Sequence, residues 1–287
     1  ITFKNISTNS IFTCDFINNT ASLNGGGINY RETPHNITFN ANFINNTSPR
    51  GGGVNFFESF ENVIFNGEFI ANSAVNGGAI AAGEGIIKDV SFKNNHAVTG
   101  GAVFFRINGS VTNCNFTGNN ALGTGGAIFA VNNINILNSV FDNNSAGKSG
   151  GAVYINNTFS NSKISSVFIN NSANNGGAIY FNGKINNITI NGSFKGNNAE
   201  RSGGAIFVRG QSVNNDFSSE FYDNRAGQAS GGAIFFYNLA ENNVFESIFT
   251  TNYALYGGGM FFYKKANSNK FSSDFTNNTA ESCGGAI

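Results

Sequence analysis

Residues 141–153 read FDNNSAGKSGGAV, and this stretch contains the two motifs that decide the fold. The first is Phe-x-x-Asn, from Phe141 to Asn144, and the second is Gly-Gly followed by a small and an aliphatic residue, from Gly150 to Val153. Both motifs occur eleven times, always in this order, with a period of 23 to 28 residues. Such a period indicates stacked supersecondary units, because a single unit cannot bury its own apolar face.

The residues around the motifs favour strands. Short segments rich in Ile, Val and Phe alternate with Gly and Asn, which favour turns because both tolerate left-handed backbone angles. The aliphatic tetrad residue and the residue two positions later, such as Val153 and Ile155, are expected to face the core together. The residue four positions before the motif phenylalanine, such as Leu137, is also expected to face the core, with Lys88 and Thr112 as exceptions.

These patterns predict an all-β fold, a right-handed, single-stranded parallel β-helix of about eleven coils with 23–28 residues per coil. Its core runs through every repeat, so residues 1–287 are predicted to form one continuous domain. Because the sequence begins and ends within repeats, we interpret it as a fragment of a longer chain.

The motif asparagine is present in all eleven copies. Like residues should stack from coil to coil in a β-helix, so these side chains are expected to form an amide ladder at a corner. The paired glycines would let adjacent coils approach closely there. The predicted ladder consists of Asn19, Asn46, Asn72, Asn95, Asn119, Asn144, Asn171, Asn197, Asn224, Asn252 and Asn278.

The composition excludes several functions. Lys and Arg number 16, as do Asp and Glu, and only 11% of residues are charged, which argues against nucleic acid as a partner. No apolar run reaches the roughly 18 residues of a membrane-spanning helix. Cys14 and Cys114 lie four coils apart, about 19 Å, so the cysteines are interpreted as small buried hydrophobic residues and not as disulfides.

The paired motifs resemble the repeats of chlamydial polymorphic membrane proteins and of the adhesin-like proteins of methanogenic archaea. The resemblance covers essentially the whole chain, although the copies at Gly25, Gly51 and Gly257 have glycine where alanine is usual. In those families such repeats imply a right-handed parallel β-helix, surface exposure and a role in adhesion. The 53 asparagines of this chain favour the archaeal type.

One acidic constellation could carry chemistry. Glu32, Glu58 and Glu84 share the same offset after the tetrad in three consecutive coils. Stacked carboxylates repel unless they are splayed, protonated or bridged by a cation. We interpret them as solvated loop acids, with a cation site or a sugar-cleaving site as alternatives. No catalytic residue, metal site or cofactor is predicted elsewhere, because the two histidines are at unrelated offsets and zinc spacings are absent.

Aromatic residues provide the better candidate for binding. They occupy the position after the aliphatic tetrad residue in seven consecutive coils, where alternation points them outward and where the first three coils have Asn, Asn and Ala. An exposed stripe of this kind calls for a neighbouring domain, a second copy of the chain, or a sugar or protein ligand. The stripe consists of Phe104, Phe129, Tyr154, Tyr180, Phe207, Phe235 and Phe261.

Asparagine-linked glycosylation is a further expectation. Thirteen Asn-x-Ser/Thr sequons occur, and several place the acceptor directly before the ladder asparagine, at corners that a glycan could reach. These acceptors are Asn18, Asn143, Asn170 and Asn277.

Together these features predict a non-catalytic segment of a large extracellular adhesin or stalk protein at the cell surface, which mediates attachment or cell–cell contact. Its partners would be other domains of the same chain, other copies, or a protein or glycan of a host or neighbouring cell. Two alternatives are a filament subunit that stacks end to end and a β-helix polysaccharide lyase or hydrolase that uses the three glutamates.

Overall fold

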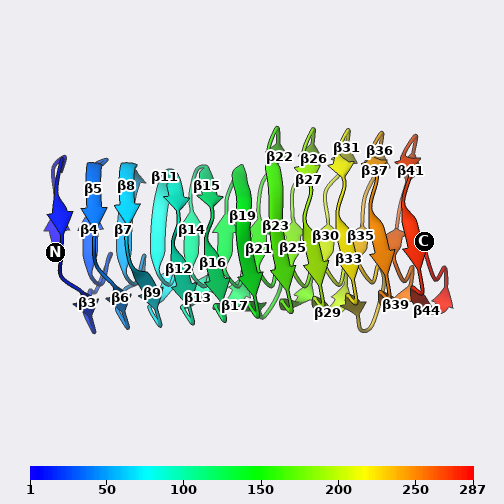
Figure 1. Cartoon of the computed structure of the whole chain (residues 1–287), viewed down its shortest axis with the longest axis horizontal. Coiled ribbons are helices and arrows are strands. Elements are labelled where there is room, and N and C mark those ends of the chain that lie inside the picture. Colours follow the sequence, from blue (N-terminus) through cyan, green and yellow to red (C-terminus); the bar gives the residue numbers. More distant parts are fainter.

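A computed structural model describes the whole chain, residues 1–287, as one stack of parallel coils (Figure 1). Each strand pairs with the strand one repeat before it and one repeat after it; Val153, for example, lies between Ile128 and Ile179. All strand pairs are parallel and no helix is present. The predicted all-β parallel β-helix of about eleven coils is therefore confirmed.

The first face of the coil follows the glycine tetrads. Its strands are mostly three residues long. In strands from the middle of the rod, the first and third residues are buried and the second is half-buried. They are β1 (Thr2–Phe3), β4 (Ile28–Tyr30), β7 (Val54–Ser59), β11 (Ile80–Lys88), β14 (Val103–Phe105), β18 (Ile128–Ala130), β21 (Val153–Ile155), β25 (Ile179–Phe181), β30 (Ile206–Val208), β35 (Ile234–Phe236) and β40 (Met260–Phe262).

The second face contains the motif phenylalanines, and the long strand β11 joins it to the first face in one 27-stranded sheet. Its strands are β3 (Phe16–Ile17), β6 (Phe43–Ile44), β9 (Glu68–Ile70), β12 (Ser91–Lys93), β16 (Asn115–Thr117), β19 (Ile134–Asp142), β23 (Lys163–Ile169), β28 (Ser193–Lys195), β33 (Glu220–Tyr222), β38 (Ile248–Thr250) and β43 (Asp274–Thr276), preceded in their coils by β15 (Gly109–Thr112), β27 (Thr189–Ile190), β32 (Asp216–Phe217), β37 (Val244–Phe245) and β42 (Lys270–Phe271). In the first three coils this preceding position forms a separate sheet of β2 (Ile11–Phe12), β5 (His35–Phe39) and β8 (Glu61–Phe65).

The third face follows the motif asparagines and is a nine-stranded sheet. Its strands are β10 (Ser73–Asn76), β13 (His96–Thr99), β17 (Asn120–Thr124), β20 (Ser145–Ala146), β24 (Ser172–Asn175), β29 (Asn198–Ser202), β34 (Arg225–Ala226), β39 (Tyr253–Tyr256) and β44 (Thr279–Cys283). Later coils extend further and add a five-stranded sheet of β22 (Phe159–Ser160), β26 (Ile185–Asn186), β31 (Ser212–Val213), β36 (Ala240–Glu241) and β41 (Ala266–Asn267), which projects at the top of Figure 1.

The tetrad glycines form the turn between the third and first faces. Gly125 has a φ of +68°, a left-handed angle that side chains disfavour. At Gly126 the limit is space, because a Cβ atom there would lie 1.9 Å from the carbonyl oxygen of Gly151 in the next coil. The two glycines thus meet different requirements, one of conformation and one of close approach.

A continuous column of phenylalanine rings fills the core behind the second face. Consecutive rings stack face to face, with centroids 4.7 to 5.2 Å apart. Each ring therefore has apolar neighbours above and below as well as across the core. The column consists of Phe16, Phe43, Phe69, Phe92, Phe116, Phe141, Phe168, Phe194, Phe221, Phe249 and Phe275.

We expect Phe168→Ala to lower the free energy of unfolding by about 3–5 kcal/mol, because it leaves a cavity between two rings that cannot collapse onto each other. Phe168 is fully buried between Phe141 and Phe194 at centroid distances of 4.8 Å. Denaturant unfolding followed by circular dichroism measures the change. A midpoint equal to that of the wild type would contradict the packing described.

The register of the core differs from the prediction in three coils. Ile87, Val111 and Ile136, five residues before the motif phenylalanine, are fully buried, and Leu137 is only half-buried. The register shifts between Leu137 and Val140, so that Ile136 pairs with Ile164, which lies four positions before its own phenylalanine. This shift explains the polar Lys88 and Thr112, which point away from the core. The expectation that Leu137 is a core residue is therefore wrong.

Candidate functional site

The structure places the eleven predicted ladder asparagines in one row at the corner that leads to the third face. The Nδ2 atom of Asn144 donates to Oδ1 of Asn171 at 3.0 Å and to the carbonyl oxygen of Phe116 at 2.9 Å. Its own Oδ1 accepts from the backbone N–H and from Nδ2 of Asn119, both at 3.0 Å. From Asn46 to Asn252 the ladder asparagines are fully buried, so their amides must be satisfied within the protein, and they are. The row is a structural device.

The residue before each ladder asparagine has left-handed backbone angles in all eleven coils. Asparagine or glycine occupies most of these positions, but Ala71 has a φ of 54° and Thr251 a φ of 55°. A side chain with a Cβ atom and no local hydrogen bond is disfavoured at such angles. The turn therefore explains why Asn-Asn pairs recur in the repeat.

We expect Ala71→Asn to stabilise the protein by about 0.5–1 kcal/mol, because asparagine tolerates the left-handed angles that alanine disfavours. Asn45, at the same position one coil earlier, already makes an exposed amide contact of 2.7 Å with Asn18. Thermal unfolding provides the measurement, and Ala266→Asn, at an exposed strand position with ordinary angles, provides the control. Equal effects of the two substitutions would contradict the backbone argument.

The four candidate glycan acceptors lie at this left-handed corner position. Asn18, Asn143, Asn170 and Asn277 are exposed, with φ values between 51° and 57°.

Two shorter rows were missed in the sequence. Asn215, Asn243 and Asn269 form a second amide ladder, with Nδ2–Oδ1 distances of 2.9 Å. Backbone N–H groups of neighbouring coils bind the hydroxyls of a serine row, in which the N–H of Ser219 lies 3.0 Å from Oγ of Ser247. The signal was present, since each asparagine precedes the motif phenylalanine by six residues and each serine precedes it by two.

The three glutamates do not form a single row. Glu32 and Glu58 line the same hollow, with Arg31 beside them. A bulge after Ala82 shifts the next coil, so that Glu84 pairs with Ser59 and lines a different hollow. No group of three or more His, Cys, Asp or Glu residues is close enough together to hold a metal ion. The shared offset therefore does not place all three carboxylates in one row, because the coil of Glu58 contains an extra residue between Phe56 and Ser59. All three glutamates are exposed.

The seven stripe aromatics form a second ring column, outside the core, on the first face. Their centroids are 4.8 to 5.8 Å apart, and the planes of consecutive rings are inclined by 3° to 29°. Each ring covers the face of the next, so the stripe presents ring edges to solvent rather than ring faces. For this reason Tyr180, Phe207 and Phe235 are only 8%, 8% and 6% exposed. The expectation of a fully exposed stripe is wrong at these three positions.

The column is widest near its C-terminal end. Tyr237 and Tyr263 stack on each other at 5.2 Å beside Phe235, and both are exposed. Tyr180 of the stripe is largely shielded from solvent. This burial raises the pKa of its phenol to about 12, although the positive charge of Arg209 beside it acts in the opposite direction. At neutral pH the Tyr180 phenol is therefore uncharged, and the aromatic surface is amphipathic, with phenol groups at its margin.

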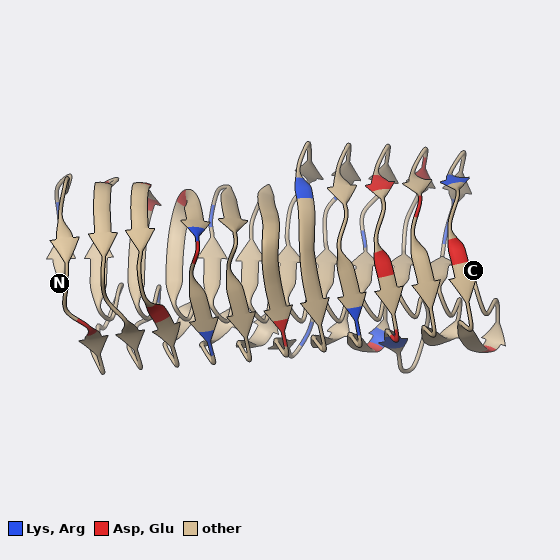
Figure 2. Cartoon of the chain, viewed as in Figure 1, with Lys and Arg blue, Asp and Glu red and all other residues tan.

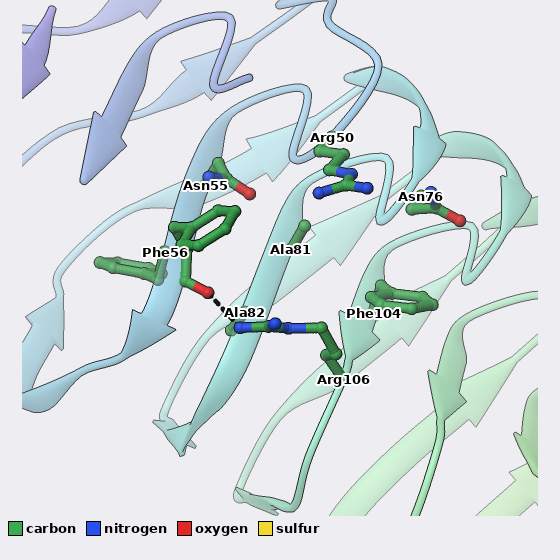
Figure 3. A pocket seen from close by; sticks show the side chains of 9 residues that line it. Arg50, Asn55, Phe56, Asn76, Ala81, Ala82, Phe104 and Arg106 are labelled. Carbon is green, nitrogen blue, oxygen red and sulfur yellow. Dashed lines mark hydrogen bonds between the residues drawn. The ribbon is translucent and has the colours of Figure 1, made fainter. Parts of the chain in front are cut away.

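The column ends abruptly at its other end. Ala81 lies opposite Phe104 in the preceding coil, and Asn55 lies opposite Ala81 one coil further back. A hollow of about 110 Å³ occupies this step (Figure 3). Arg50 and Arg106 flank it on opposite sides of Ala81, as Figure 3 shows.

The three cysteines are free and unlike one another. Cys114 is buried, as predicted, but Cys14 and Cys283 are exposed, because each lies in a terminal coil with a neighbour on one side only. Burial raises the pKa of the Cys114 thiol to about 11.

We expect two thiols of the native protein to react rapidly with a disulfide reagent at pH 8, and Cys114 to react only on unfolding, because its thiolate is both inaccessible and disfavoured. Absorbance of the released chromophore counts the thiols. Three fast thiols would contradict the burial of Cys114, and a Cys114→Ser variant identifies the slow one.

Charged side chains are sparse over the whole rod (Figure 2). His35 lies 3.0 Å from Glu61, and the remaining ion pairs are exposed pairs that contribute little to stability. The structure contains no helix with the length and hydropathy needed to cross a membrane.

Comparison with known proteins gives one family. The Chlamydia polymorphic membrane protein repeat matches residues 138–156, 165–182 and 272–287. The three matched segments each contain a motif phenylalanine, its ladder asparagine and the following glycine tetrad. No curated protein and no solved structure matches the chain. The chain is thus a parallel β-solenoid whose repeats are similar to those of polymorphic membrane proteins.

Proposed function

We propose that this chain is a non-catalytic segment of a large extracellular adhesin or stalk protein, displayed at the cell surface, where it projects other domains and mediates attachment or cell–cell contact. The match to the polymorphic membrane protein repeat, a repeat that implies surface exposure and adhesion, supports this proposal. The observation that carries it is the second ring column. It serves no purpose in the core, yet it extends over seven coils of one face.

The physical properties of the rod suit this work. Eleven coils at about 4.8 Å per coil make a rod of roughly 50 Å. Each coil is bonded to the next along all three faces, which makes bending costly. The rod carries almost no charge pattern that would select nucleic acid.

Partners of three kinds fit the ring column: another domain of the same long chain, a second copy, or a protein or glycan of a host or neighbouring cell. Ring edges and the exposed Tyr237 and Tyr263 favour a protein partner over a sugar along most of the column, because sugars stack on ring faces. The ring column of the first face is thus the proposed contact surface.

Competition for attachment tests the proposal. Purified residues 1–287, added in excess, are expected to reduce attachment of the cells that display the protein, because they occupy the same receptor. A variant with Tyr237→Ser and Tyr263→Ser is expected to compete less well, whereas Lys163→Ser and Lys195→Ser on the second face serve as control. Undiminished attachment at every concentration of the wild-type rod would contradict an adhesive role.

The alternatives predict different results. A filament subunit would form end-to-end assemblies of separate copies at micromolar concentration, visible by light scattering. A polysaccharide lyase or hydrolase would release reducing or unsaturated ends, and Glu58→Gln would abolish the release. We expect neither result, since no observation on the rod favours either function.

A further inference from the structure

The step between Asn55 and Phe104 has the dimensions of one missing ring. Ring spacing in the outer column is 4.8 to 5.8 Å, close to the spacing of the coils. The next ring of the column would therefore lie at the level of Ala81, where the chain supplies only a methyl group. One face of the Phe104 ring stacks on Phe129 at 5.3 Å, and its other face looks onto this empty level.

The rest of the lining is mixed, since Phe56 and Phe57 add apolar surface and Asn55, Asn76 and the two arginines add polar groups. Asn55 is 3% exposed, and its Nδ2 donates to Oδ1 of Asn29 at 2.8 Å, so that its Oδ1 is left as an acceptor beside the hollow. Asn76 lines the hollow from the third face. The floor is formed by Ala81 and Ala82.

The side chains of Arg50 and Arg106 differ in whether they already have a partner within the protein. Arg106 is held in place, since its Nη2 donates to the carbonyl oxygen of Phe57 at 2.5 Å, a bond drawn as the dashed line in Figure 3. The same nitrogen lies 3.7 Å from Glu58. Its guanidinium also lies over the Phe57 ring, 5.2 Å from the centroid. Arg50 makes no such ion pair or hydrogen bond through its side chain, so its charge is available to an anion.

We propose that this hollow binds a six-membered sugar ring that carries a carboxylate. The apolar C–H face of the sugar stacks on the free face of Phe104 at the level of Ala81. Its carboxylate pairs with Arg50, whose planar guanidinium matches a carboxylate with two hydrogen bonds. The amides of Asn55 and Asn76 bind hydroxyls at the rim.

An aromatic side chain fits the same space less well. A benzene ring has no hydrogen-bonding groups at its edge, so it would leave the arginine and both amides desolvated and unpaired. A sugar ring has apolar C–H faces and a rim of hydroxyls, which matches a hollow lined both by phenylalanine rings and by amide and guanidinium groups. This inference rests on the proposed function, for which it names the chemical class of one ligand.

Titration of the whole chain with sodium glucuronate, followed by NMR of the Phe104 ring and the Arg50 Nε–H group, tests the site. We expect saturable shifts at these two residues and at least tenfold weaker binding of glucose. Arg50→Gln is expected to weaken glucuronate binding at least tenfold, whereas Arg201→Gln, on the same rod beside a different hollow, leaves it unchanged.

Ala81→Phe supplies the missing ring from the chain itself. It is expected to abolish glucuronate binding while the unfolding midpoint stays equal or rises, because the new ring stacks on Phe104. Tighter binding of a glucuronate-containing tetrasaccharide than of the monosaccharide would identify an acidic polysaccharide, and not the free sugar, as the source of the ligand.

Equal binding of glucuronate and glucose, no shift at Phe104 or Arg50, or wild-type binding by Ala81→Phe would each overturn the inference. These outcomes are separable from failure of the adhesive function. A rod that competes for attachment without binding glucuronate refutes the sugar site alone. A rod that binds glucuronate without affecting attachment refutes adhesion alone.

Discussion

An Asn144→Ala variant is expected to lose about 2–6 kcal/mol of its free energy of unfolding, at 1–3 kcal/mol for each buried polar group left without a partner. Two donors of Asn119 lose their partner at this corner: its backbone N–H and one N–H of its side-chain amide, both of which donate to Oδ1 of Asn144. Water cannot replace the amide, because the position is fully buried. Denaturant unfolding by circular dichroism measures the loss.

Two further variants make this test specific. Asn174→Ala removes an amide that is half-exposed and makes no side-chain hydrogen bond, so it should cost less than about 0.5 kcal/mol. Asn19→Ala, at the exposed start of the ladder, should cost far less than Asn144→Ala. If all three variants unfold alike, the ladder does not hold the corner.

A Gly126→Ala variant is expected to lose more than about 5 kcal/mol, enough to prevent the central coils from docking. The added Cβ atom would lie 1.9 Å from the carbonyl oxygen of Gly151 and 2.5 Å from that of Ser145. Both are backbone atoms of coils that are hydrogen-bonded to each other, so neither can move without breaking the pairing of two coils. Soluble yield and the cooperativity of thermal unfolding report the effect.

Gly227→Ala is the matched control for steric clash. Its added Cβ atom would approach no atom closer than 3.3 Å, and Gly227 has ordinary backbone angles. We expect a change of less than about 1 kcal/mol, because alanine restricts the unfolded chain more than glycine does. A loss at Gly227 as large as that at Gly126 would mean that glycine matters here for flexibility and not for the approach of the coils.

The fold could be predicted because the same two motifs recur eleven times in the same order. Phe-x-x-Asn and the glycine tetrad each describe one corner of a coil, and stacking follows since no coil buries its apolar residues alone. The register shift near Leu137 could not be predicted, because it depends on which of two neighbouring residues packs better against the coils above and below. The pattern of a single sequence shows only the alternation of apolar and polar residues, and not the register between coils.

The outer ring column shows a similar limit. Alternation placed Tyr180 and its equivalents outside the core, but not the parallel stacking that hides ring faces and exposes edges. The hollow at Ala81 was missed for a related reason. In the sequence, Ala81 is recognisable only as a position that lacks the aromatic residue of later coils. The two arginines that flank the hollow come from different coils, so the sequence does not show that they lie close together.

Electron microscopy of intact cells, labelled with gold-conjugated antibody against residues 1–287, tests the account most directly. We expect label on projections outside unpermeabilised cells, with coils that continue along one covalent chain and at least one neighbouring molecule or cell in contact with the first face. Label only after permeabilisation would contradict a surface adhesin. Label on filaments built of separate copies that abut end to end would replace the adhesin by a filament protein.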